Sequence, residues 1–240
     1  MIFAAGLGTR LKPITDTMPK ALVPLAGKPL LQWQVEKLRD AGITDIIVNV
    51  HHFPDMIIDT IRANNGWGCN ILISDERDQL LDTGGGLKKA KSQIINHKSQ
   101  MASEPILACN VDILSNIDLR ALVSAYEREN VSKLVVSERE TQRYLCFDAQ
   151  DHLCGWTNIK TGEVKGVDGR HLAFSGMQIL SSEILALLSQ MPQDKFSLID
   201  FYLRVMKEVP LRAYVPKDYR MMDVGKIDQI EEAEKFAERL

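Results

Sequence analysis

Residues 4–31 read AAGLGTRLKPITDTMPKALVPLAGKPLL and follow directly on a short apolar run at the start of the chain. The glycines of this stretch let the backbone approach a ligand closely and point its N–H groups at an anion. They would serve equally in a plain turn between a strand and a helix. The presence of Arg10, Lys20 and Lys28 beside them favours an anion site, because such cations hold polyphosphates through charge-assisted hydrogen bonds.

Two well-known phosphate-binding motifs do not match this stretch. The dinucleotide-binding pattern needs a third glycine where Leu11 stands, and an acidic residue about 20 positions further on. The P-loop needs Ser or Thr after its lysine, but Pro29 follows Gly27 and Lys28. The stretch is therefore neither a dinucleotide-binding turn nor a P-loop.

Strand and helix patterns alternate through the first half of the chain. Residues 1–5 form a short apolar run typical of a buried strand, and Leu31, Val35 and Leu38 recur at the spacing of one helix face. We expect further strands at 46–50, 71–73, 106–109 and 134–136, helices at 55–63, from Leu87 and at 118–129, and a surface loop at 96–104. This alternation predicts a mostly parallel sheet covered by helices.

The second half has a different pattern. Residues 143–180 contain short, alternating, turn-rich runs, which indicate an antiparallel insert. Two helices are expected at about 181–190 and 197–207, strands at 211–215 and 220–224, and a charged helix from about 227. No repeat or linker divides the chain.

Composition excludes several classes of protein. The chain has 240 residues and a net charge of −3, which argues against a nucleic-acid-binding protein. No run approaches the roughly 18 apolar residues of a membrane span, and the first residues do not resemble a signal peptide. The four cysteines form no CxxC pair. We expect a cytoplasmic protein with reduced thiols and no membrane partner.

The motifs together closely resemble the sugar-1-phosphate nucleotidyltransferases, also called NDP-sugar pyrophosphorylases. The resemblance begins in residues 4–31 and continues through 81–86 (LDTGGG), 110–112 (NVD), 174–177 (FSGM) and 222–225 (MDVG). It looks closest to the N-acetylmuramate-1-phosphate uridylyltransferases, with mannose- and heptose-1-phosphate guanylyltransferases as close competitors.

The resemblance implies an α/β fold, with a Rossmann-like, mostly parallel mixed sheet flanked by helices and a small antiparallel lobe on the sugar side. It implies a single domain over residues 1–240. Within that domain we expect a nucleotide-binding half at about 1–135, a sugar-binding half at about 136–225 and a C-terminal helix at 226–240.

The implied reaction joins an NTP and a sugar 1-phosphate to give an NDP-sugar and pyrophosphate. The attacking phosphate oxygen is already an anion, so catalysis must come from positioning and from neutralising the repulsion between phosphates. By resemblance, Arg10 holds the leaving pyrophosphate and Lys20 lies between the α-phosphate and the attacking phosphate. Asp112 and Asp223 match the family's metal positions and are the expected Mg²⁺ ligands.

Further contacts follow from the resemblance alone. Nucleotide-binding residues would be Ala4, Ala5, Gly6, Gly8, Thr9, Arg10, Asp82, Thr83 and Gly85, and sugar-binding residues would be Asn110, Gly155, Phe174, Ser175, Gly176 and Asp200. Asp200 would serve equally as a first-turn helix residue. The family's usual glycine is replaced by Val111, and the glutamate–lysine pair of many relatives does not align cleanly, so Lys160 and Glu163 are not assigned.

Several alternatives stay open at this stage. Lys28 either touches phosphates or flanks a turn. The protein could be a non-catalytic nucleotide-sugar-binding module, although all four candidate phosphate and metal residues are present. Cytidylyl transfer to a polyol or choline phosphate is another reading. The base, the sugar and the oligomeric state are not determined by the sequence.

Overall fold

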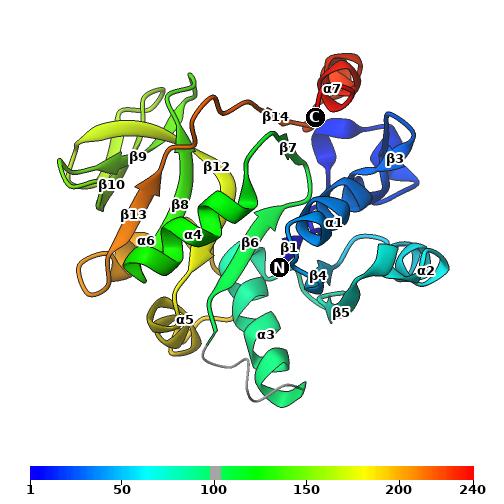
Figure 1. Cartoon of the computed structure of the whole chain (residues 1–240), viewed down its shortest axis with the longest axis horizontal. Helices are drawn as coiled ribbons and strands as arrows, with labels where there is room; N and C mark the ends of the chain where they lie inside the picture. The colour runs from blue at the N-terminus through cyan, green and yellow to red at the C-terminus, as the bar shows by residue number, and fades with distance from the viewer. Residues whose placement is uncertain (98–103) are drawn as a thin grey trace. The chain divides into compact units, whose positions relative to one another are not determined.

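The computed structural model describes residues 1–97 and 104–240 (Figure 1). Most of the surface loop expected at 96–104 thus lies outside the described residues. The chain forms two compact units from alternating segments. Unit 1 comprises Met1–Leu80, Cys109–Leu119 and Arg220–Leu240, and unit 2 comprises Leu81–Ala108 and Arg120–Tyr219.

Unit 1 is organised around a short buried strand, β1 (Ile2–Phe3). It pairs in parallel with β4 (Asp45–Val50), and β4 pairs in parallel with β5 (Asn70–Asp75) (Figure 1). On its other side β1 pairs with the last two residues of β6 (Ile106–Asn110). Parallel strands require crossover connections, and helices supply two of them.

The helices of unit 1 include the one expected from the apolar spacing. Leu31, Val35 and Leu38 lie on α1 (Leu30–Asp40), and all three are buried. The second crossover is α2 (Pro54–Ala63), which packs on β5. The unit is completed by two antiparallel pairs, β2 (Pro24–Leu25) with β3 (Lys28–Pro29) and β7 (Ile113–Ser115) with β14 (Met221–Asp223), and by α7 (Ile230–Ala237).

Unit 2 contains the antiparallel insert expected between residues 143 and 180. Its longest strand, β12 (Arg170–Leu180), runs antiparallel to both β8 (Ser132–Ser137) and β9 (Arg143–Phe147). Antiparallel pairing continues to β10 (Leu153–Asn158) and β11 (Glu163–Gly166), and β13 (Leu211–Tyr214) adds a parallel partner for β8. Its helices are α3 (Asp82–His97), α4 (Leu119–Glu129), α5 (Ser182–Ser189) and α6 (Leu198–Val205). The first residue of α4, Leu119, still belongs to unit 1.

The expected fold class is confirmed, because mixed parallel and antiparallel strands are flanked by helices. The borders of the two units differ from the expected halves at 1–135 and 136–225. Residues 81–108 and 120–135 belong to unit 2, and residues 220–225 belong to unit 1. The single-domain expectation stays a prediction. In the described parts of the chain, no helix has both the length and the apolarity needed to cross a bilayer.

The glycine run Thr83–Gly86 is not a loop. It lies in the first turn of α3, which begins at Asp82 rather than near Leu87. The glycines are needed there because the segment 194–196 packs against the helix backbone, and Gly84 N–H donates to the Phe196 carbonyl at 2.9 Å. Close approach of two backbones thus outweighs the poor helix propensity of glycine.

Replacing Gly85 by alanine should lower the free energy of unfolding by about 1–3 kcal/mol, because the new methyl group would overlap the carbonyl oxygen of Asp194. Urea denaturation measures the change. Gly6→Ala is a matched control, since no heavy atom lies within 4 Å of its added Cβ, and it should change stability by less than about 0.5 kcal/mol. Equal stability of the two variants would contradict this packing.

Candidate active site

The end of β1 is held by a chain of buried polar side chains in unit 1. The backbone N–H of Ala4 donates to Asn49 Oδ1 at 2.8 Å. Asn49 Nδ2 in turn donates to Glu76 Oε1 at 2.7 Å. Asn49 and Glu76 are 3% and 1% exposed, so the hydrogen bond between them is shielded from water. The Ala4 N–H is therefore already engaged, and the turn that follows starts from a fixed point.

The glycine-rich turn folds back over Thr15 and Lys20. Gly8 has a φ of +63°, and a Cβ at that position would lie 2.9 Å from Thr15 Cγ2 and 3.0 Å from Lys20 Cβ. Thr15 Oγ1 donates to the Gly8 carbonyl at 2.9 Å, which closes the turn. Both the left-handed backbone and the crowding require glycine. Arg10 follows in a 3₁₀ turn and is largely exposed.

Lys20 and Asp112 form an ion pair across the core of unit 1. Lys20 is only 8% exposed, and its ammonium group donates to Asp112 Oδ2. Asp112 lies just beyond β6, and the preceding Val111 is a core residue that donates its N–H to the Phe3 carbonyl. The sequence identified both residues as candidates but did not pair them. A buried ammonium needs such a counter-ion, because desolvating an unpaired charge is costly.

Arg10 and Asp223 form a second, more exposed pair beside the first. Arg10 Nη2 lies 3.9 Å from Asp223 Oδ2. Asp223 ends β14, and the next residue, Val224, donates its N–H to the Asp112 carbonyl at 2.9 Å. A Cβ on Gly225 would lie 2.9 Å from Arg10 Nη2, so glycine leaves room for the guanidinium. The two aspartates are thus brought together by the backbone.

The residues of unit 1 fit a divalent metal ion bound with a polyphosphate. Two carboxylates supply the hard oxygen ligands that Mg²⁺ prefers, and each is paired with a cation. A metal ion could take over the carboxylates while phosphate oxygens take over Arg10 and Lys20.

Lys28 is engaged elsewhere. Its Nζ donates to Glu36 Oε2 at 2.6 Å and lies 4.8 Å from the centre of the Trp33 ring. Partial burial of the Glu36 carboxyl opposes ionisation, but hydrogen bonds from Gln32 and Lys28 outweigh it and lower the pKa of Glu36. The structure favours the turn-flanking role for Lys28.

The candidate nucleotide residues of unit 2 lie at the start of α3. Asp82 has a φ of +61° and accepts a hydrogen bond from the Thr83 N–H. Thr83 Oγ1 accepts from the Leu198 N–H at 3.0 Å, which links α3 to α6. Thr83 and Gly85 are therefore part of helix packing, a role that the sequence did not indicate.

The candidate sugar residues are spread over several strands. Asn110 ends β6, where it pairs in register with Phe3 in unit 1. Ser175 is 1% exposed, and its hydroxyl has no hydrogen-bond partner among the described residues. Gly176, with a φ of +66°, lies where the β12–β8 register shifts. Gly155 on β10 is closely covered by the backbone of residues 165–167.

Asp200 belongs to a cluster that sequence reasoning missed. Its N–H donates to Oγ of the N-cap residue Ser197 at 3.1 Å, so Asp200 lies in the first turn of α6, the alternative position considered for it. Its carboxylate also accepts from Lys165 Nζ at 3.3 Å. Lys165 lies 3.8 Å from Glu163 and 5.3 Å from the Trp156 ring centre. Glu163 and Lys165 are two residues apart on one strand, so their side chains lie on the same face. This spacing is the feature of the sequence that could have indicated the cluster.

Comparison with known proteins gives a consistent result. A family model described as nucleotidyl transferase matches residues 1–239. N-acetylmuramate alpha-1-phosphate uridylyltransferase of Caulobacter vibrioides is 31% identical over 214 residues, which cover 85% of this chain and 83% of the relative. Mannose-1-phosphate guanyltransferase of Yarrowia lipolytica is 31% identical over 140 residues, covering 58% of this chain and 37% of the relative.

A solved structure resembles the whole fold. HddC from Yersinia pseudotuberculosis, complexed with GMP-PN, matches with a TM-score of 0.75 at 26% identity and covers 98% of this chain and 97% of that chain.

Replacing Asn49 tests whether its side chain fixes the end of β1. Asn49→Ala should cost about 2–3 kcal/mol of stability, because it leaves the Ala4 N–H and the Glu76 carboxyl buried without this partner. Asn70→Ala removes an exposed amide that also bonds a carboxylate and should cost under about 0.5 kcal/mol. Chemical denaturation compares them, and a similar loss in both variants would show that the Asn49 bridge is unimportant.

Proposed function

The chain belongs to the nucleotidyl transferase family, and from this premise we propose that it transfers a uridylyl group from UTP to N-acetylmuramate 1-phosphate. The products are the UDP-sugar and pyrophosphate. The observation that carries the proposal is the paired set of cations and carboxylates in unit 1, on the residues expected to bind phosphate and metal. The choice of substrates rests on the uridylyltransferase relative, which aligns along most of both chains.

The chemical step forms one P–O bond and breaks another. An oxygen of the sugar phosphate attacks the α-phosphorus of the NTP, and the bond to the β-phosphate breaks in line with it. The nucleophile is already ionised, so no side chain has to remove a proton. The barrier is the repulsion between two anions, and positive charge placed beside them lowers it.

Arg10 and Lys20 supply that positive charge in the proposal. The exposed guanidinium of Arg10 can bind two oxygens of the leaving pyrophosphate at once. Lys20 is held by the 3₁₀ turn and by Asp112, so its ammonium is positioned before substrate arrives. Positioning of this kind avoids reorganisation during the reaction.

Asp112 and Asp223 are the proposed ligands of Mg²⁺. When bound, the ion would polarise phosphate oxygens and offset their negative charge. The two carboxylates come from neighbouring backbone segments, since Val224 N–H bonds the Asp112 carbonyl. If Mg²⁺ were bound to Asp112, the ammonium group of Lys20 would be free to pair with a phosphate in place of that carboxylate.

The remaining assignments are also proposals. Ala5, Gly6, Gly8 and Thr9 would present backbone groups to the nucleotide, together with Ala4, Asp82, Thr83 and Gly85, and Asn110, Gly155, Ser175, Gly176 and Asp200 would contact the sugar. The unpaired hydroxyl of Ser175 supports its place in this set. An enzyme that consumes an NTP is expected in the cytoplasm, where the four cysteines would be reduced.

GTP with mannose or heptose 1-phosphate is the second candidate. It is supported by the guanyltransferase relative and by the structural neighbour complexed with GMP-PN. The two candidates share the phosphate chemistry of unit 1 and differ in the base and the sugar.

A substrate panel separates these candidates. Pyrophosphate release should be fastest with UTP and N-acetylmuramate 1-phosphate in the presence of Mg²⁺, among the four NTPs and muramyl, mannosyl, heptosyl and glucosyl phosphates. Preference for GTP with a mannosyl or heptosyl phosphate would contradict the first candidate function and support the second. Preference for CTP with a polyol or choline phosphate, or silence across the panel, would refute both.

Lys20→Ala and Asp112→Asn should each lower kcat by about 10²–10³-fold, because each removes a group that offsets charge in the transition state. Lys12→Ala is the matched control, since Lys12 is exposed in the same stretch and pairs with Asp16 at 2.9 Å. It should stay within about twofold of the wild-type rate. Circular dichroism checks that each variant is folded. A near-normal Mg²⁺-dependent rate in Asp112→Asn would refute the metal assignment.

A further inference from the structure

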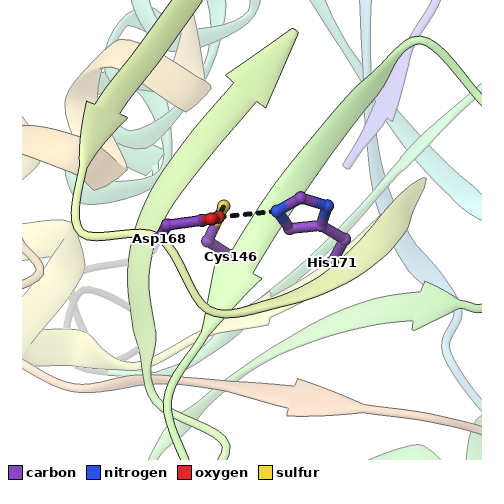
Figure 2. A group of neighbouring side chains, drawn as sticks. All are labelled: Cys146, Asp168 and His171. Atoms are coloured by element: carbon purple, nitrogen blue, oxygen red, sulfur yellow. Dashed lines mark hydrogen bonds and ion pairs between the residues drawn. The ribbon is translucent and has the colours of Figure 1, made fainter. Parts of the chain in front are cut away.

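Three side chains of unit 2 with different ligand chemistry meet next to Gly155, the residue that Cys146 opposes in the β9–β10 pair, and none of the three is among the residues assigned above. Cys146 on β9 and His171 on β12 stand directly opposite each other in the antiparallel pair. Directly opposed residues place their side chains on the same face of a sheet. Asp168 lies in the turn before β12, three residues ahead of His171, and points between them (Figure 2).

One oxygen atom is the centre of this group. Asp168 Oδ1 is 2.6 Å from His171 Nε2 (Figure 2). It also accepts hydrogen bonds from the Gly169 N–H at 3.0 Å and the Cys146 thiol at 3.7 Å. The sulfur, nitrogen and oxygen atoms all lie within 4.8 Å of one another. Among the side chains that the structure describes, no other three histidine, cysteine or acidic groups converge in this way.

We propose that Cys146, Asp168 and His171 form a binding site for a zinc ion. A thiolate, an imidazole and a carboxylate are the ligands that Zn²⁺ takes, whereas Mg²⁺ selects oxygen ligands. Ligand atoms of a tetrahedral zinc site lie about 3–4 Å apart, so small side-chain rotations close the present group around an ion. Cys146 is buried, while Asp168 and His171 are accessible, so a fourth position can face water.

Binding requires the loss of one proton and no redox partner. The Cys146 S–H bond breaks, a sulfur–zinc bond forms and the proton leaves to solvent. Before the ion binds, burial, with the nearby Asp168 carboxylate adding to it, raises the pKa of Cys146 to about 11. In the free chain the thiol donates to Asp168 Oδ1.

A nucleophilic role for Cys146 fits the geometry less well. In a cysteine–histidine pair the imidazole must accept the thiol proton, but here Asp168 Oδ1 lies between the two and receives both contacts. The raised pKa of Cys146 also disfavours the thiolate. A bound zinc ion would join β9, β12 and the turn at residues 167–169, and would therefore stabilise unit 2 without entering the transferase reaction.

Cobalt provides a direct spectroscopic test. The full-length chain is freed of metal with a chelator and titrated with Co²⁺, which occupies zinc sites and reports its ligands by absorption. We expect one ion per chain with a thiolate-to-cobalt charge-transfer band, displacement of that band by Zn²⁺, and an increase in Tm with Zn²⁺. Mg²⁺ should produce neither the band nor its displacement, because it avoids sulfur ligands.

Variants identify the ligands. Cys146→Ala, Asp168→Asn and His171→Gln should each abolish or strongly weaken the band, and the last two change accessible residues, so they remain informative if Cys146→Ala does not fold. Cys154→Ala is the control, because the Cys154 thiol contacts the Cys146 carbonyl at 3.3 Å but is not in the group.

The carboxylates of unit 1 supply no sulfur, so cobalt bound there would not give the band. The proposal is wrong if the wild-type chain shows no sulfur band, if the band survives His171→Gln unchanged, or if Cys154→Ala removes it. None of these outcomes depends on transferase activity.

Discussion

The ion pair between Lys20 and Asp112 is the interaction on which the rest of the candidate site depends. An ammonium group that is nearly removed from water must have an anion beside it. Asp112 is that anion in the free protein, and in the proposed reaction a substrate phosphate would replace it. The glycine at position 8, the turn over Thr15 and the bond from Val224 to Asp112 all serve to hold this pair in place.

Glycine has three different uses in this chain, and only contacts distinguish them. Gly8 combines a left-handed backbone with crowding by Thr15 and Lys20. Gly225 leaves space for the guanidinium of Arg10. Gly84 and Gly85 let a second chain segment lie against α3. Chain flexibility explains none of them, since each position is set by a close neighbour.

The residues proposed to act on phosphate and those proposed to contact the sugar lie mostly in different units. In the proposed reaction, the residues paired as Lys20–Asp112 and Arg10–Asp223 in unit 1 would offset phosphate charge, which any nucleotide and sugar phosphate have in common. Unit 2 contains most of the residues proposed to contact the sugar, among them Asp200, which clusters with Lys165 and Glu163 beside Trp156.

The sequence by itself determined the alternation of strands and helices, the buried face of α1, the antiparallel insert and the family motifs, because hydrophobic period and short motifs are local properties. Tertiary structure alone decided that Lys20 pairs with Asp112, 92 positions away, and that Cys146 lies opposite His171. It also decided that α3 starts at Asp82, since the glycines are explained only by residues 194–196 packed against them. Contacts between distant residues depend on strand register and backbone packing, which no local pattern encodes.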